Sequence, residues 1–145
     1  MVNLRRTVAA DASFLYEVLE QTMREYVVNT WGQWLEQDAR KATAADAAAG
    51  VAEIVEVDGR PAGWLRVDRL VTHIQLEQLF LLAVYQGKGI GAYLVEELQF
   101  EAKLKHLPLR LRVLRVNPAK RLYERLGFRV ISATDERFFM EYALP

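Results

Sequence analysis

The hexapeptide Gln86-Gly87-Lys88-Gly89-Ile90-Gly91 separates a predicted strand over residues 72–82 from a predicted helix over residues 89–106. Its three alternating glycines leave the backbone unobstructed, so several N–H groups can approach one anion closely. The helix that follows adds unpaired N–H groups and the positive end of its dipole, and Lys88 adds a mobile cation. We therefore expect this glycine loop to bind a pyrophosphate. The alternative is a strand-to-helix turn that binds nothing.

The glycine spacing argues against two familiar phosphate-binding loops. A Walker loop needs Gly-Lys followed by Ser or Thr, and here Gly89 follows Lys88. A dinucleotide fingerprint reads Gly-x-Gly-x-x-Gly near the start of a βαβ unit. Here the glycines read Gly-x-Gly-x-Gly, after a region with an antiparallel pattern. A different phosphate ligand is indicated.

On both sides of the loop, apolar periodicity and turn residues predict one α/β domain with a mixed sheet. Asp58-Gly59 predicts a hairpin. Further strands are expected over residues 3–8, 51–57, 62–67, 109–114, 128–131 and 138–144. Further helices are expected after Asp11 as N-cap, from Trp31 to about Ala49 with Gly50 ending it, and from Pro118 as first helical residue to Gly127.

Composition narrows the class of protein. The chain has 145 residues, with 19 basic and 19 acidic side chains, so it lacks the basic excess of a nucleic-acid binder. It has no cysteine, which excludes disulfides, thiolate metal sites and cysteine nucleophiles, and with two histidines we expect no metal site. No segment approaches the ~20 apolar residues of a membrane span. We expect a cytoplasmic protein that binds neither nucleic acid nor membrane.

Two motifs resemble those of the GNAT superfamily of N-acetyltransferases. The family's central signature is Gln/Arg-x-x-Gly-x-Gly/Ala, which Gln86, Gly89 and Gly91 match. A second signature has an asparagine, a tyrosine six residues later and then Gly-Phe, which residues 117–128 resemble. Many relatives have proline where this chain has Ala83. The resemblance is sharp over residues 75–131 and extends weakly over the rest.

The resemblance implies a single N-acetyltransferase domain over residues 1–145. Its fold would be a mixed, mostly antiparallel sheet of about seven strands, splayed between the fourth and fifth strands, with about four helices. Acetyl-CoA would be the co-substrate, lying in the gap between those strands. Residues expected to bind it are Leu81 and Ala83 through their backbone, Asn117 through its side chain, and the loop residues Gln86, Gly87, Lys88, Gly89, Ile90 and Gly91.

The implied reaction transfers an acetyl group from acetyl-CoA to a primary amine of a small metabolite or peptide, directly, in a ternary complex. Tyr123 matches the family's tyrosine that protonates the departing thiolate. Glu77 is the candidate base, and His73 is a weaker one. The alternatives are a core tyrosine, and a strand carboxylate that pairs with Arg110 or Arg112. A non-catalytic module that senses acyl-CoA remains a second hypothesis for the whole chain.

Acceptor specificity is expected from the first two helices and the fifth strand. Tyr26 and Trp31 are large side chains near the junction of the helices, where the family shapes its acceptor pocket; plain core packing is the alternative. Arg112 would suit an acceptor that carries a carboxylate, unless it belongs to a solvated face or a structural ion pair. The sequence is compatible with either a monomer or a homodimer.

Overall fold

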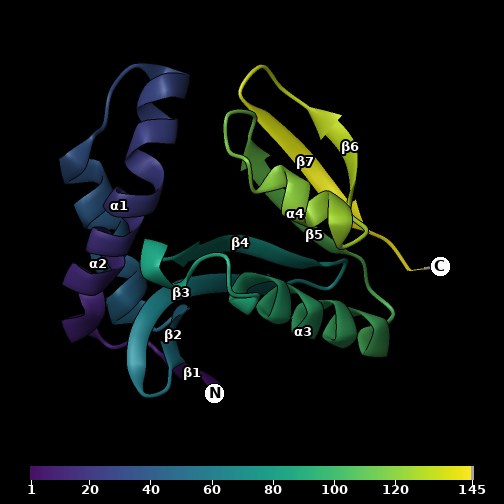
Figure 1. The fold of residues 1–145 in the computed structure, drawn as a ribbon, viewed down its shortest axis with the longest axis horizontal. Helices are drawn as coiled ribbons and strands as arrows, with labels where there is room; N and C mark the ends of the chain where they lie inside the picture. The colour runs from purple at the N-terminus through teal and green to yellow at the C-terminus, as the bar shows by residue number, and fades with distance from the viewer. Residues whose placement is uncertain (145) are drawn as a thin grey trace. The chain divides into compact units, whose positions relative to one another are not determined.

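The computed structural model describes residues 1–144. In this range it has four α-helices and seven strands, and the strands form one mixed sheet of order β1-β2-β3-β4-β5-β7-β6 (Figure 1). The expected fold class is confirmed. The elements are β1 (Val2–Arg6), α1 (Ala12–Trp31), α2 (Glu36–Ala49), β2 (Ala52–Val57), β3 (Arg60–Arg69), β4 (Ile74–Leu81), α3 (Ile90–Lys105), β5 (Leu109–Leu114), α4 (Lys120–Arg125), β6 (Arg129–Ala133) and β7 (Arg137–Tyr142), with short 3₁₀ helices at Ala9–Asp11 and Ala83–Tyr85.

β4 and β5 form the parallel pair of this sheet. Their register runs from Ile74 opposite Leu109 to Leu76 opposite Leu111, so they pair along only part of their length. The pairs β1–β2, β2–β3, β5–β7 and β6–β7 are antiparallel. The polypeptide divides into two compact units, one of residues 1–66 and 78–88, the other of residues 67–77 and those from 89 onward.

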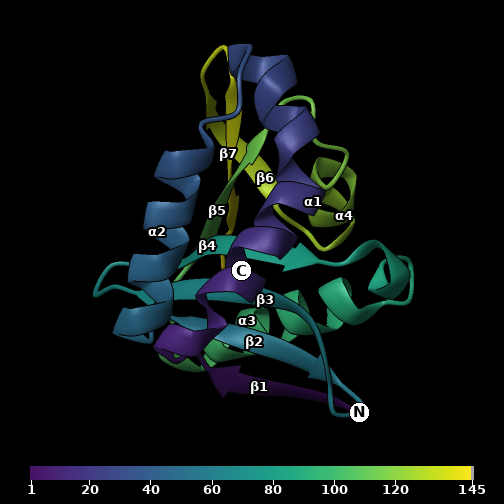
Figure 2. The same ribbon diagram turned by 90° about the vertical axis from the view of Figure 1, so that its left-hand side faces the viewer.

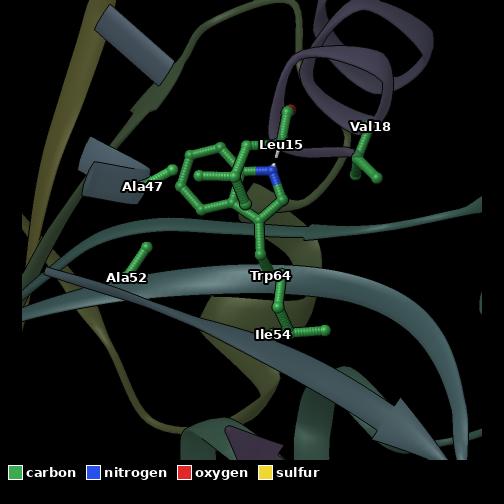
Figure 3. Close-up of a cluster of buried hydrophobic side chains, with 6 residues drawn as sticks. All are labelled: Leu15, Val18, Ala47, Ala52, Ile54 and Trp64. Atoms are coloured by element: carbon green, nitrogen blue, oxygen red, sulfur yellow. Dashed lines mark hydrogen bonds between the residues drawn. The ribbon is translucent and has the colours of Figure 1, made fainter. Parts of the chain in front are cut away.

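The first unit is built around Trp64 of β3. Its side chain is fully buried among Leu15, Val18, Ala47, Ala52 and Ile54 (Figure 3). The indole Nε1–H donates a hydrogen bond of 3.1 Å to the Leu15 carbonyl oxygen, so the buried polar atom is satisfied. Figure 2 shows α1 and α2 side by side, and both helices contribute residues to this cluster.

Gly63 allows β3 and β4 to approach each other. A Cβ at this position would lie 2.0 Å from the Phe80 carbonyl oxygen and 2.9 Å from the Leu81 Cα. The neighbouring Trp64 meets the Phe80 ring edge-on at 5.1 Å between centroids. The position therefore needs glycine because there is no room for a Cβ atom.

The second unit has its own core on α3, β5 and β7. The predicted apolar stripe of the helix is buried, namely Ile90, Leu94, Val95, Leu98 and Ala102. Leu109, Leu111 and Met140 are buried on the strands. Gln99 is buried too, and its Nε2 donates to the Leu126 carbonyl oxygen at 2.7 Å. Helix α3 is therefore tied to the residue that ends α4.

The predicted start of α1 is confirmed, because Asp11 is its N-cap residue, although the Asp11 side chain does not bond to the helix. Its carboxylate instead accepts two 3.0 Å hydrogen bonds from Arg5 and one from the Val8 N–H. Two other predicted helix starts are wrong. Trp31 is the last residue of α1, because Gly32 ends this helix with a left-handed φ of 88°. Pro118 lies in a turn before α4, where its carbonyl oxygen accepts from the Arg121 N–H.

The predicted stops at Gly50 and Gly127 hold, with φ of 66° and 95°. Asp58 and Gly59 also have positive φ and join β2 to β3, as the hairpin prediction required. Among the helices described, none is long and apolar enough to span a bilayer.

Candidate functional site

The glycine loop has two residues in the left-handed region of backbone conformation. Gly87 and Gly89 have φ of 72° and 81°, the left-handed region where glycine is at no steric disadvantage. Gly89 is the N-cap residue of α3. A Cβ on either glycine would meet nothing within 4 Å, so the backbone is open to a ligand at both positions.

The loop presents a run of unpaired N–H groups. The Gln86 N–H donates to the Ala83 carbonyl oxygen, and the next amide hydrogen bond along the chain is from Tyr93 to Gly89. Within residues 1–144, the six amides from residue 87 to residue 92 thus have no acceptor. Lys88 is exposed and forms no ion pair with any described residue. Six donors, a cation and the positive end of a 16-residue helix favour a multiply charged anion.

Gln86 fixes this loop to the end of β4. Its side-chain Nε2 donates a hydrogen bond of 2.8 Å to the Leu81 carbonyl oxygen. The side chain therefore positions the loop, and the donor that Gln86 has left for an anion is the second N–H of Nε2. The Leu81 carbonyl oxygen has a second lone pair available.

Tyr123 lies on α4 and is 9% exposed. Its ring meets Phe128 edge-on at 5.8 Å between centroids. Burial raises the pKa of Tyr123 to about 12, so the phenol keeps its proton at neutral pH. The Tyr123 hydroxyl has no hydrogen-bond partner in the described chain. Its oxygen is not fully closed off from solvent, because among the described residues only Thr7 Oγ1 is both fully buried and without a partner. Tyr123 is thus a core residue with an available donor.

Asn117 precedes α4 and has two functional groups with different roles. Its Oδ1 accepts a hydrogen bond of 2.9 Å from the Ala119 N–H, which stabilises the turn at Pro118. Its Nδ2 has no partner among the residues that the structure describes. Asn117 thus stabilises the turn before α4 without being its N-cap residue, which is Ala119, and a donor is left over for a ligand.

Glu77 and Arg112 belong to one polar face of the second unit. In an antiparallel pair, residues directly opposite each other project to the same face. On β5 and β7, Arg110 is opposite Glu141 and Arg112 is opposite Phe139, as the strands run side by side in Figure 1. We name this the polar sheet face; it comprises Gln75, Glu77, Arg110, Arg112, Arg137, Phe139 and Glu141. Glu77 Oε2 lies 3.6 Å from Arg112 Nη2, which brings these two predicted residues together.

His73 immediately precedes β4, and its Nδ1 is 2.9 Å from Thr72 Oγ1 and its Nε2 is 3.2 Å from Gln75 Oε1. Both ring nitrogens therefore have neighbours of their own. Sequence reasoning did not find Arg137 and Phe139 on the polar sheet face. Their alternation within residues 137–142 indicates a shared face, but only the register with β5 identifies which residues they accompany.

The two predicted aromatic acceptor residues lie on α1 of the first unit. Tyr26 is partly buried, and Trp31 is 46% exposed at the end of the helix. Trp34 has a structural contact, because its Nε1–H donates to the Tyr16 hydroxyl at 3.0 Å.

Comparison with known proteins identifies the sequence and the fold. A family model described as an acetyltransferase (GNAT) domain matches residues 48–130. No curated protein matches the sequence. The fold is similar to that of the PaiA N-acetyltransferase of Thermoplasma acidophilum in complex with coenzyme A, with 19% identity, a TM-score of 0.80 and 99% of each chain covered.

Two further solved structures have the same fold. An acetyltransferase of Thermus thermophilus has 21% identity and a TM-score of 0.76, with 99% of this chain and 97% of that chain covered. The ribosomal-protein-S18-alanine N-acetyltransferase of Escherichia coli has 20% identity and a TM-score of 0.71, with 100% and 96% covered.

Proposed function

The chain belongs to the GNAT acetyltransferase family, and on this premise we propose that it transfers an acetyl group from acetyl-CoA to a primary amine, directly, in a ternary complex. The observation that carries the proposal is the run of six amides from residue 87 to residue 92, which have no acceptor within residues 1–144. A diphosphate offers several anionic oxygens to such a run. The PaiA neighbour was crystallised with coenzyme A, which has this group.

The residues present fit this co-substrate. The amides of the glycine loop and Lys88 would bind the diphosphate, with Gln86 holding the loop to Leu81. The backbone of Leu81 and Ala83 and the free Nδ2 of Asn117 would bind the amides of the pantetheine arm, as an added strand does. Acetyl-CoA supplies the activated acetyl thioester, and the protein supplies its position.

The chemistry requires a neutral amine, since an alkylamine has a pKa of ~10 and is mostly protonated at neutral pH. Glu77 would accept the proton that the ammonium loses, directly or through water. The amine nitrogen then forms its bond to the acetyl carbon while the carbon–sulfur bond breaks. The Tyr123 hydroxyl would donate its proton to the departing sulfur. The second proton, which the nitrogen loses as it becomes an amide, would pass through water to restore the Tyr123 hydroxyl. Its raised pKa of about 12 suits a donor that must be protonated before the reaction.

Acceptor binding is assigned to three residues. Tyr26 and Trp31 would shape an apolar wall from α1, and Arg112 would meet a negative group. The acceptors to be tested include both small amines and peptides, because the Escherichia coli neighbour is named for a ribosomal protein.

The experiment combines coenzyme A titration with thiol release. Titration calorimetry with coenzyme A should give micromolar or tighter binding, about −8 kcal/mol. Gly89→Ala should weaken this binding at least tenfold, because a Cβ would enter the open space beside the amides where the diphosphate is bound. Gly32→Ala is the matched control, since Gly32 has a similar φ of 88° and open surroundings but lies at the end of α1.

Thiol release is then measured with acetyl-CoA and a panel of primary amines. Turnover with at least one amine is expected. If coenzyme A binds but no amine is acetylated, the chain is a sensor of acyl-CoA rather than an enzyme. If coenzyme A does not bind, or binds equally well to Gly89→Ala, the assignment of the loop is wrong.

A further inference from the structure

The arginines of the polar sheet face have unequal partners. Arg110 Nε donates to Glu141 Oε2 at 2.7 Å, a hydrogen-bonded ion pair. Arg112 lies two residues later on the same strand, and its contact with Glu77 is an ion pair of 3.6 Å. This separation is too long for a hydrogen bond. In the described chain, the Arg112 guanidinium donates no hydrogen bond.

A guanidinium has five N–H donors in a planar fork that fits a carboxylate. The Arg112 side chain is 45% exposed, so its donors can be reached from solvent. Phe139 stands opposite it on β7 and offers an apolar surface beside the charge. The surroundings of Arg112 therefore differ from those of Arg110, although both are arginines on one face of one strand.

A second arginine of the polar sheet face adds to the positive charge at this point. Arg137 is two residues before Phe139 on β7 and opposite Leu114 on β5. Its pKa is lowered, first by partial burial and then by the positive charge of Arg112, while Glu136 acts in the opposite direction. Two guanidiniums thus repel each other here, and an anion that binds between them relieves the repulsion.

We propose that Arg112, assisted by Arg137, binds a carboxylate of the acetyl acceptor, and that the acceptor is a small amino acid rather than a peptide N-terminus. The proposal rests on the proposed function, in which Glu77 receives the proton of the acceptor amine. Because Glu77 Oε2 and Arg112 Nη2 are 3.6 Å apart, an amine on one and a carboxylate on the other must be separated by few bonds. A free amino acid has this arrangement, whereas the α-carboxyl group next to a peptide N-terminus is an uncharged amide.

The test uses matched acceptors that differ in this one charge. The twenty common L-amino acids and their carboxamides are assayed for thiol release with saturating acetyl-CoA, with O-phosphoethanolamine as an amine whose anion is a phosphate. At least one amino acid should exceed its carboxamide in kcat/KM by about 10- to 100-fold, the range expected for losing charge-assisted hydrogen bonds.

The variants locate the effect. Arg112→Met should bring the ratio of acid to amide close to one. Arg112→Lys should keep part of the preference, because it keeps the charge and loses the fork. Arg110→Met is the control, and it should retain the full ratio because Arg110 is already paired with Glu141. Thermal melting checks that each variant folds. If Arg112→Met does not fold, the ratio of acid to amide is measured in Arg112→Lys instead.

The outcomes separate this inference from the proposed function. Equal rates with acids and amides, or a full preference in Arg112→Met, would overturn the inference and leave acetyl transfer intact. A preference for O-phosphoethanolamine would overturn the proposal that the anionic group of the acceptor is a carboxylate. If nothing is acetylated, calorimetric titration of each amino acid and its amide into the protein with coenzyme A decides the matter. Binding of an amino acid that Arg112→Met weakens tenfold supports the inference, and no binding of any amino acid refutes it.

Discussion

Replacing Gly63 by alanine should strongly destabilise the protein, although alanine is the better residue for an ordinary strand. Gly63 does not have a positive φ, so its backbone conformation alone would tolerate a side chain. The added Cβ, however, would lie 2.0 Å from the Phe80 carbonyl oxygen, whereas real contacts of this kind essentially never fall below 3.0 Å. The Cβ and this oxygen must therefore move apart by at least 1.0 Å, the difference between these two distances.

The expected cost follows from what that movement disturbs. Overpacking in a close-packed interior costs about 1–3 kcal/mol, and loosening the edge-on contact of Phe80 with Trp64 adds about 0.5–1.5 kcal/mol. We expect Gly63→Ala to lower the free energy of unfolding by roughly 1.5–4.5 kcal/mol, and Tm by roughly 5–15 °C for a chain of this size. Urea unfolding and thermal melting measure both quantities.

A control distinguishes lack of space from backbone strain. Gly59 has the opposite properties, with a left-handed φ of 81° and nothing within 4 Å of an added Cβ. Gly59→Ala should cost about 1–2 kcal/mol through its backbone alone and leave the near-ultraviolet circular dichroism of the tryptophans unchanged. Gly63→Ala should change that spectrum, because Trp64 is adjacent to it. A Gly63→Ala protein as stable as the parent, within about 0.5 kcal/mol by the same urea assay, would refute the packing argument.

Three other predictions concern titratable groups. Tyr123→Phe should lower kcat by about 100-fold or more without weakening coenzyme A binding, since it removes the proton donor only; unchanged turnover would exclude the tyrosine as the acid. The raised pKa of Tyr123 means that the folded state keeps this proton to a higher pH than the unfolded state does. Stability is therefore lost as pH rises from about 10 to about 12, a slope that urea titrations should show in the parent and not in Tyr123→Phe. The contribution of Glu101 to stability depends on pH in the opposite direction, because hydrogen bonds from Arg69 and Lys105 lower its pKa to about 2. Its contribution, up to about 1 kcal/mol, should be lost as pH falls from 4.5 towards 2 and be absent in Glu101→Gln.

Local signals in the sequence predicted much of the fold. Asp58-Gly59 predicted the hairpin correctly because both residues adopt the left-handed region that such a turn needs. The strand over residues 109–114 and the helix after the glycine loop were found from periodicity. Trp31 was assigned to the wrong helix because Gly32 was not considered as the end of α1. Helix boundaries depend on such single positions, and periodicity does not specify them.

The candidate site was predictable where it is contiguous in the chain. The left-handed glycines and free amides of the loop follow from local backbone preferences. The grouping of Arg137 and Phe139 with Arg112 could not be predicted, because it depends on the register of two strands that are more than twenty residues apart. The need for Gly63 has the same origin, since the atoms that exclude a side chain belong to a different strand.

The path of the chain through the two compact units constrains how the protein can be divided. The polypeptide changes unit three times, after residues 66, 77 and 88, and two of these crossings fall within β3 and β4. No single proteolytic nick or cloning junction yields both halves as uninterrupted polypeptides. Split-protein reporters and deletion series that cut once therefore cannot separate the two units, so the chain should be kept whole when fusions are planned.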